Sequence, residues 1–404
     1  MNLRYKLLVL SILSLLLMSG CWNYRELNDL AFPLAIGIDR VPETDLYHFS
    51  FQVVNARAIA GNKSGAVVPV VVYSSDGRTL LEAARKASKK IPRRLNVQHV
   101  SDLIIGEDLA RNGMEEIFDF MERDAEPRLR TRVFIAKNTD AESILKALTP
   151  IESIPANAML GKLKTTAKVF GENYEVSIDD VIRGLLTKGG GPVVNGIKLS
   201  GQQELAKYKS SLERTDVPAE ISLDGIGLFK EGKLIGWLNN GESRGVAWIN
   251  NNINYTIVSL DCQDHKNGIA IDVFNTKTRI KADWRGGQPI VHIGIRDVGM
   301  VGEVICSSFD PSSSAELRKL ELEWNEKVKE EIVQAVRKVQ SMKTDVLGFG
   351  EAIERANPKG WKKIEKQWDT LFSTCEFDVT VESKIRRTGK ITKPYLHEIK
   401  KEEQ

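Results

Sequence analysis

The chain has 404 residues, of which 42% are hydrophobic and 27% are charged, and its formal net charge is +3. This composition is typical of a soluble globular protein, and the length exceeds what one hydrophobic core usually supports, so two or three domains are expected. Without Arg4 and Lys6, which lie in the first twenty residues, 55 basic residues stand against 54 acidic ones. This balance excludes the basic surface of a nucleic-acid-binding protein.

The first twenty residues have the three parts of a signal peptide. Arg4 and Lys6 give a positive start, residues 7–18 form an apolar run, and Ser19 and Gly20 are small. The run is too short for a membrane anchor, because a spanning helix needs about 20 apolar residues. We therefore expect residues 1–20 to be removed, and no later segment resembles a membrane span.

Cys21 follows the small residues directly, as in a lipoprotein signal, in which the thiol receives a diacylglyceryl group. Met18 stands three residues earlier, where Leu is usual, and the two side chains have similar volume and flexibility. Cys21 is therefore the predicted lipidation site. The alternative is an ordinary signal peptide with a chance cysteine near its end. Two acyl chains would give stable attachment, since each buried methylene contributes about 0.8 kcal/mol.

Two further patterns leave alternatives open. The strongest local excess of positive charge comes from Lys86, Lys89, Lys90, Arg93 and Arg94. This cluster could face anionic lipid headgroups, although such a run is more often the solvated face of a helix.

Three cysteines follow the predicted lipidation site, namely Cys262, Cys306 and Cys375. Their odd number allows at most one disulfide, and the first two lie in strand-like runs, so one bridge is possible. Three buried thiols are the favoured alternative in a protein of this size. No pair of these cysteines has the spacing of metal ligands.

Residues 21–150 are predicted to form an N-terminal α/β domain, because strands and helices alternate along them. The expected strands cover 32–40, 46–54, 67–74, 97–106 and 130–137, and the expected helices cover 79–90, 113–123 and 141–148. Pro150 and Pro155 then break the pattern. A domain boundary is therefore predicted at residue 150.

Residues 151–250 are the predicted middle domain, with helices at 159–170 and 177–186 and a hairpin near 224–238. The glycines at 189–191 do not indicate a phosphate-binding loop, because Pro192 follows and no helix opens there. Residues 251–404 are the predicted C-terminal domain. Five short alternating runs between 254 and 309 predict an antiparallel sheet with a turn every eight to twelve residues. A long helix over 312–344 should lie on that sheet, and a last strand is expected over 376–387.

The predicted fold class is thus α+β, a mixed α/β arrangement of three domains, each a β-sheet flanked by helices. No catalytic pattern is present. The histidines are scattered without ligand spacing, and no nucleophile elbow, phosphate loop or dinucleotide motif follows a predicted strand. We therefore predict no catalytic residues, no metal site, no cofactor and no enzymatic activity. The polar residues stand at positions predicted to be on the surface or in turns. This distribution favours a binding or assembly module over an enzyme.

Five ordered blocks carry a family resemblance over nearly the whole chain after residue 20. They are residues 21–27, 93–100, 106–128, 227–245 and 343–368. Together they resemble the C subunit of bacterial spore germinant receptors, a lipoprotein family. Asn23 departs from the pattern, because many members carry Asp there.

The resemblance implies a non-enzymatic, three-domain subunit, anchored through diacylglycerol on Cys21 at the outer face of the spore inner membrane. Its implied partners are two integral-membrane germinant receptor subunits, A and B, in a receptor for nutrients. The alternative function is a lipid-anchored extracytoplasmic solute-binding protein. The sequence lacks the two long, similar α/β lobes that such proteins usually have.

Residues next to the lipid are the predicted contacts with the membrane or a partner. Trp22 and Tyr24 would lie at headgroup depth, where amphipathic rings are favoured. Arg25 could pair with a lipid phosphate, and Glu26 could contact a partner. The alternative is that this segment packs on its own body.

A glycine-rich segment after the predicted long helix, with Asp345, Gly348, Gly350 and Glu351, invites a ligand-binding interpretation. A tight turn that ends the helix is favoured instead.

Overall fold

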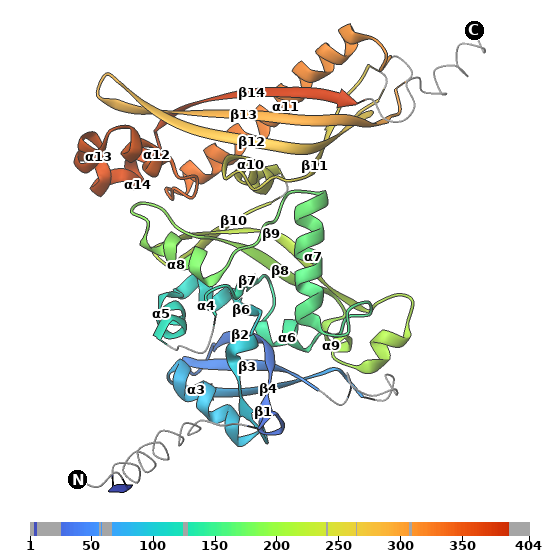
Figure 1. Ribbon diagram of the computed structural model, residues 1–404, viewed down its shortest axis with the longest axis vertical. Helices are drawn as coiled ribbons and strands as arrows, with labels where there is room; N and C mark the ends of the chain where they lie inside the picture. Colours follow the sequence, from blue (N-terminus) through green and yellow to red (C-terminus); the bar gives the residue numbers. More distant parts are fainter. Residues whose placement is uncertain are drawn as a thin grey trace.

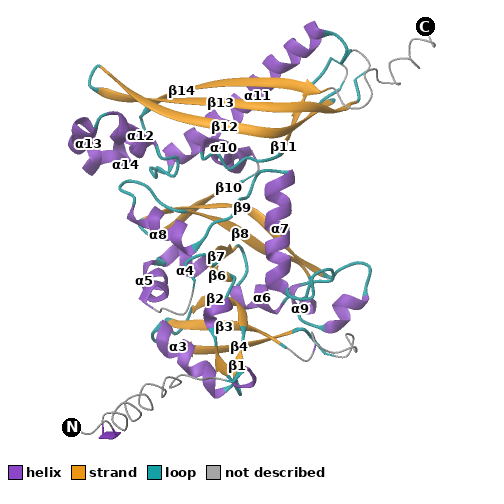
Figure 2. Ribbon diagram, in the orientation of Figure 1, coloured by secondary structure: helices purple, strands orange, loops and turns teal. Residues whose placement is uncertain are grey.

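The computed structural model describes residues 4–5, 26–55, 58, 67–123, 128–239, 241–263, 265–306 and 309–387. These residues form an elongated body, with strands β1 to β4 at one end and strands β11 to β14 at the other (Figure 1). Several sheets are flanked by helices (Figure 2), which confirms the predicted mixed α/β fold.

The larger sheet has eight strands in the order β10-β9-β8-β7-β6-β2-β3-β4. They are β2 (Pro33–Val41), β3 (Leu46–Val54), β4 (Val70–Gly77), β6 (Asp102–Gly106), β7 (Arg132–Ala136), β8 (Val193–Gly201), β9 (Ala219–Lys230) and β10 (Lys233–Leu238). The central strands β2, β6, β7 and β8 are parallel, and the flanking pairs are antiparallel. The sheet therefore runs on without interruption from the segment before residue 150 into the segment after it.

Regions 21–150 and 151–250 thus share one sheet, where one sheet each was expected. β7 pairs with β8 in parallel, for example through Ile135 and Gly196. A parallel pair needs a long crossover, and the helical residues between 141 and 186 supply it. Pro150 and Pro155 lie within this crossover, so they interrupt local structure without ending the sheet.

Helices cover both faces of this sheet. One face carries α3 (Leu80–Lys86), α4 (Glu107–Asn112), α5 (Glu115–Arg123) and α8 (Ile178–Leu186), and the other carries α6 (Ala141–Lys146), α7 (Pro155–Val169) and α9 (Gln203–Ala206). Along β6, Leu103 and Ile105 belong to the first core, while Ile104 belongs to the second. Burial on both faces explains why the central strands are continuous apolar runs.

The C-terminal sheet has the order β11-β12-β13-β14. Its strands are β11 (Thr256–Leu260), β12 (Ile269–Arg285), β13 (Gln288–Val304) and β14 (Glu376–Arg387). Two corrections follow. The short runs predicted between 269 and 304 merge into two strands of 17 residues each, joined at Gly286 and Gly287, which have positive φ. The sheet is also not wholly antiparallel, because β14 pairs in parallel with β13.

Helices supply the crossover that a parallel β13-β14 pair requires. They are α11 (Ser314–Ser341), α12 (Phe349–Ala356), α13 (Pro358–Ile364) and α14 (Trp368–Phe372). The apolar stripe of α11, which includes Leu320, Trp324 and Val328, is buried in the same core as β12 and β13. The long helix thus lies on the sheet as its spacing predicts. α10 (Gly241–Ile249) joins this core too, although the sequence placed it in the middle domain.

Short elements complete the fold. They are the parallel pair β1 (Leu30–Ala31) and β5 (Arg94–Leu95) and the 3₁₀ turns η1 (Leu27–Asp29), η2 (Ala87–Lys89), η3 (Val97–His99), η4 (Lys209–Glu213) and η5 (Glu365–Gln367). Among the described residues, no helix has the length and apolar character needed to cross a membrane.

A disulfide joins Cys262 to Cys306, so the favoured alternative of three buried thiols is wrong for this pair. Cys375 is free and buried. Leu260 of β11 and Val304 of β13 both pair with Ile269, the first residue of β12. The two cysteines therefore follow the strands on either side of β12, namely β11 and β13, and meet just ahead of its first residue. Gly268 lies beneath them, because a Cβ there would come within 2.6 Å of both sulfurs.

We expect the double substitution Cys262→Ser/Cys306→Ser to lower the free energy of unfolding by about 2–4 kcal/mol, because the bridge constrains the unfolded chain. Thermal unfolding should show the loss in the variant and in wild type under reducing conditions. Cys375→Ser is the control for loss of a thiol. Thiol titration of the denatured, unreduced protein should find one free thiol among the three cysteines, and three free thiols would contradict the bridge.

Candidate functional site

The residues predicted to meet the membrane are mostly beyond what the structure describes. Cys21, Trp22, Tyr24 and Arg25 lie outside the described residues. Glu26 is exposed, and its carbonyl oxygen accepts a hydrogen bond of 3.0 Å from Asp29 N as η1 begins. The described body therefore starts at the end of the molecule that carries β1 and α3 (Figure 1).

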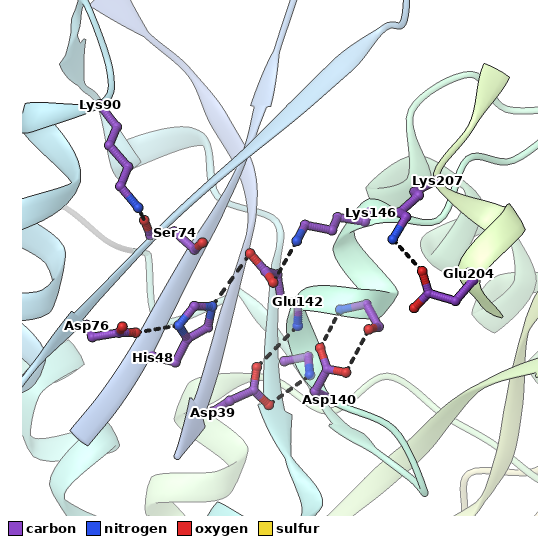
Figure 3. A network of polar contacts seen from close by, with 12 residues as sticks. Asp39, His48, Ser74, Asp76, Lys90, Asp140, Glu142, Lys146, Glu204 and Lys207 are labelled. Carbon is purple, nitrogen blue, oxygen red and sulfur yellow. Dashed lines mark hydrogen bonds and ion pairs between the residues drawn. The ribbon is translucent and has the colours of Figure 1, made fainter. Parts of the chain in front are cut away.

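A dense network of titratable side chains joins β3, β4 and α6 (Figure 3). His48 on β3 lies between two carboxylates. Its Nδ1 is 2.5 Å from Asp76 Oδ1 on β4, and its Nε2 is 3.5 Å from Glu142 Oε1 on α6. Lys146 Nζ pairs with the other oxygen of Glu142 at 2.7 Å. The network therefore ties the outer strands of the sheet to the helix that covers them.

The pairing changes the pKa values of this network strongly. Hydrogen bonds to Glu142 and Asp76 raise the pKa of His48 to about 9 against the effect of burial. The bond from His48 and that from Lys146 lower the pKa of Glu142 to about 2. Near neutral pH this group is a charged imidazolium held by two carboxylates. Such a histidine cannot act as a general base, which must be unprotonated and free to accept a proton.

Asp39, at the end of β2, is the other perturbed carboxyl of this region. Its two oxygens accept hydrogen bonds from Ala141 N at 2.8 Å and Glu142 N at 3.2 Å, at the first turn of α6. Burial raises its pKa to about 6, although the backbone donors act in the opposite direction. Gly106 is required beside it, because a Cβ there would lie 2.3 Å from Asp39 Oδ1. Asp39 thus serves as a cap for α6.

Ligands of open α/β sheets bind at the carboxyl ends of parallel strands. Here this edge is filled by the protein's own contacts. Glu107, which follows β6, accepts hydrogen bonds from Asn138 N at 2.9 Å and Trp237 Nε1 at 3.1 Å. A small cavity of about 380 Å³ lies beside the His48 network, lined by Arg40, Lys146 and Lys207 among others. The polar side chains around this cavity mainly connect the strands of the sheet to α6. This network could not be predicted from the sequence, because His48, Asp76 and Glu142 come from distant segments.

The segment after α11 forms a structural joint, but its glycines do not end the long helix as predicted, because α11 ends at Ser341 and Lys343 takes the positive φ of 54°. Asp345 is buried, with its Oδ1 accepting from Leu347 N and Phe349 N and its Oδ2 from Gly350 N and Trp368 Nε1. Gly348, at φ 72°, begins the next helix. All the donor groups belong to the protein itself. The ligand interpretation of this segment is therefore not needed to explain its residues.

The joint also connects the two large parts of the molecule. Asp345 N donates to Gly189 O at 3.0 Å, and Thr344 Oγ1 donates to Phe229 O at 2.8 Å. The triple glycine is needed for this close packing, since a Cβ on Gly191 would lie 1.9 Å from Phe229 O. Within the part of the chain that the structure describes, no group of three or more His, Cys, Asp or Glu side chains is placed to hold a metal ion.

Comparison with known proteins accounts for this architecture. The family model described as "Spore germination protein N-terminal domain" matches residues 23–199, and that described as "Spore germination B3/GerAC like, C-terminal" matches residues 224–389. Spore germination protein KC of Bacillus subtilis (strain 168) is 34% identical over 401 residues, which cover 98% of each chain. The chain belongs to the C-subunit family of spore germinant receptors.

More distant members and a solved structure agree with this family. Spore germination protein B3 of the same strain is 25% identical over 383 residues, 94% of this chain and 96% of that protein. The structure titled "Crystal Structure of the GerBC protein" matches with a TM-score of 0.54 and 22% identity, covering 87% of this chain and 96% of that one. The solved structure shows the fold. Membership of the C-subunit family, which the five sequence blocks indicate, is thus confirmed.

Proposed function

We propose that this spore germination receptor subunit is a non-enzymatic assembly component, held by a lipid on Cys21 at the outer face of the spore inner membrane. Its proposed partners are the integral-membrane receptor subunits A and B. The observation that carries the proposal is the match to spore germination protein KC over nearly the whole of both chains. The sequence 18–21, with its cysteine after small residues, supports the lipid.

Internal pairing of the polar groups supports a non-enzymatic role. The perturbed carboxyls Asp39 and Glu142 bind backbone donors or basic side chains of the protein. Asp345 is saturated by four donors. A catalytic site needs a reactive group facing a substrate, with geometry that a bound molecule can reach. These clusters instead stiffen a scaffold.

The shape of the body supports an assembly role. Anchorage just before residue 26 would put β1 and α3 near the bilayer and the C-terminal sheet far from it (Figure 1). Partners in the membrane would then reach the eight-stranded part first. The alternative of an anchored solute-binding protein has less support, because the eight-stranded and four-stranded sheets have different topologies and do not form two similar lobes.

The lipid anchor is tested by Cys21→Ala in the full chain. We expect wild type in the membrane fraction and the variant unprocessed or released, since its attachment depends on the acyl chains. Cys375→Ala, which removes a buried thiol far from the signal, should behave as wild type. If the Cys21 variant were processed like wild type and sedimented with membranes to the same extent, the lipid proposal would be wrong.

A further inference from the structure

A groove of about 780 Å³ lies at the end of the body where its described part begins, bordered by α3, β5 and α5. Its floor is apolar: Phe51 comes from the large sheet, Leu95 from β5 and Phe120 from α5. Leu81 of α3 also lines it and is 51% exposed. An apolar surface left open beside polar rims is typical of a binding site.

The rim of the groove is basic. Arg85, Arg93 and Arg94 line it, and all three side chains are exposed. Among the described residues, none of these arginines forms an ion pair with an acidic side chain. Of the described residues that line the groove, Asp29 is the only acidic one. The groove therefore combines a hydrocarbon-like floor with unpaired positive charge.

The structure places four of the five residues of the basic cluster in two groups. Lys86 pairs with Glu82 at 2.7 Å, and Lys90 donates to Ser74 O at 2.6 Å. These two lysines therefore make contacts on the surface of α3 and the neighbouring strand. Arg93 and Arg94 instead line the groove together with Arg85. The solvated-helix interpretation thus fits the first group only.

We propose that this groove binds an anionic phospholipid, with one acyl chain on the apolar floor and the headgroup phosphate at Arg85, Arg93 and Arg94. Guanidinium groups bind phosphate through two parallel hydrogen bonds, which a lysine cannot provide. The volume of about 780 Å³ lies in the range of small-molecule sites, about 300–1,000 Å³.

Access to lipid rests on the proposed function, through the anchor on Cys21. Glu26, the first described residue of the body, is the fifth residue after Cys21, and a chain extends by at most about 3.6 Å per residue. The body would thus begin within about 18 Å of the anchor. Asp29, which lines the groove, is three residues further along. An anchored protein would keep the groove at the membrane surface, where anionic lipids attract basic residues.

The test is photo-cross-linking of the full-length protein to vesicles of phosphatidylcholine that contain phosphatidylglycerol with a photoactivatable acyl chain. Adducts are mapped by mass spectrometry. We expect adducts in residues 81–95 and at Phe120. Arg93→Glu/Arg94→Glu should reduce them at least fivefold, since each basic residue near an anionic surface contributes about fivefold in binding. Leu81→Asp, a substitution of an exposed side chain, should reduce them without loss of folding.

Lys359→Glu/Lys362→Glu is the matched control, because both lysines are exposed on α13 in the C-terminal domain. It should leave the adducts unchanged. Adducts elsewhere only, adducts that survive the arginine reversal, or equal labelling by a photoactivatable phosphatidylcholine would each overturn the proposal. Labelling that disappears when subunits A and B are co-reconstituted would assign the groove to a protein partner and overturn it too. Flotation with neutral vesicles reports on the Cys21 anchor alone, so failure of the anchor and failure of the groove are distinguishable.

Discussion

Substitution of Asp345 by Ala should destabilise the C-terminal domain by at least about 3 kcal/mol, because it leaves buried donors without an acceptor. Four donors bind its carboxylate in the structure, three of them backbone N–H groups at the start of α12. Trp368, the fourth donor, packs edge-on against Trp361. The substitution should therefore loosen both the helix start and the aromatic cluster.

Asp345→Asn is the matched variant. The amide keeps one acceptor oxygen but directs an NH₂ group at two donors, so we expect a smaller loss than with Ala. Chemical denaturation measures the loss, and hydrogen exchange locates it: protection should fall at Leu347, Phe349 and Gly350. Unchanged protection at these amides in the Ala variant would show that the carboxylate does not hold the joint.

Asp297→Asn should stabilise the protein, and more so at higher pH. Asp297 lies on the buried face of β13, with Thr276 and Ser383 beside it on the adjoining strands. Among the described residues, neither of its carboxyl oxygens has a hydrogen-bond partner of normal geometry. Burial raises its pKa to about 7, while the nearby Thr276 and Trp248 act in the opposite direction.

The sign of the pH dependence follows from this shift. A carboxyl whose pKa is higher in the folded state than in the unfolded state, where it is close to 4, costs nothing while both states are protonated. The cost grows as pH rises from about 4 to about 7 and is constant above that. The gain from Asp297→Asn should therefore increase by about 3 kcal/mol between pH 5 and pH 8.

Denaturant unfolding at several pH values measures this gain. Glu303→Gln is the control, because Glu303 is an exposed carboxyl on the same strand. It should show no comparable trend. A gain from Asp297→Asn that is the same at pH 5 and pH 8 would contradict a raised pKa in the core.

Much of the fold follows from local patterns. The stripe of α11 is regular enough to predict both the helix and its position on the sheet, and the helix expected from residue 177 begins there, with Ser177 capping α8 through a hydrogen bond from Asp180 N. Pairing between distant segments is a different matter. No local pattern in β7 or β8 shows that these two strands are neighbours. The parallel pairing of β14 with β13 depends on the crossover that four helices supply, which the sequence of β14 does not show either.

The candidate sites divide in the same way. Lipid attachment at Cys21 stays a prediction, and it rests on a contiguous pattern in the sequence. The sequence shows the arginines of the groove as a cluster of positive charge. It does not show the apolar floor beside them, because α5 and the large sheet supply part of that floor. The disulfide is similar, because only the strand register shows that both cysteines lie just ahead of β12. Three-dimensional proximity therefore decides the groove and the disulfide, but not Cys21.

The central claim is that this protein acts as a receptor subunit for nutrient-triggered germination and not as an independent binding protein. The most direct measurement is the fraction of spores that germinate when the gene is deleted from a strain without a redundant receptor. The deletion should abolish the response to the nutrients of that receptor and leave germination by non-nutrient triggers intact, and the wild-type gene should restore it. Unchanged nutrient germination in the deletion strain would contradict the claim.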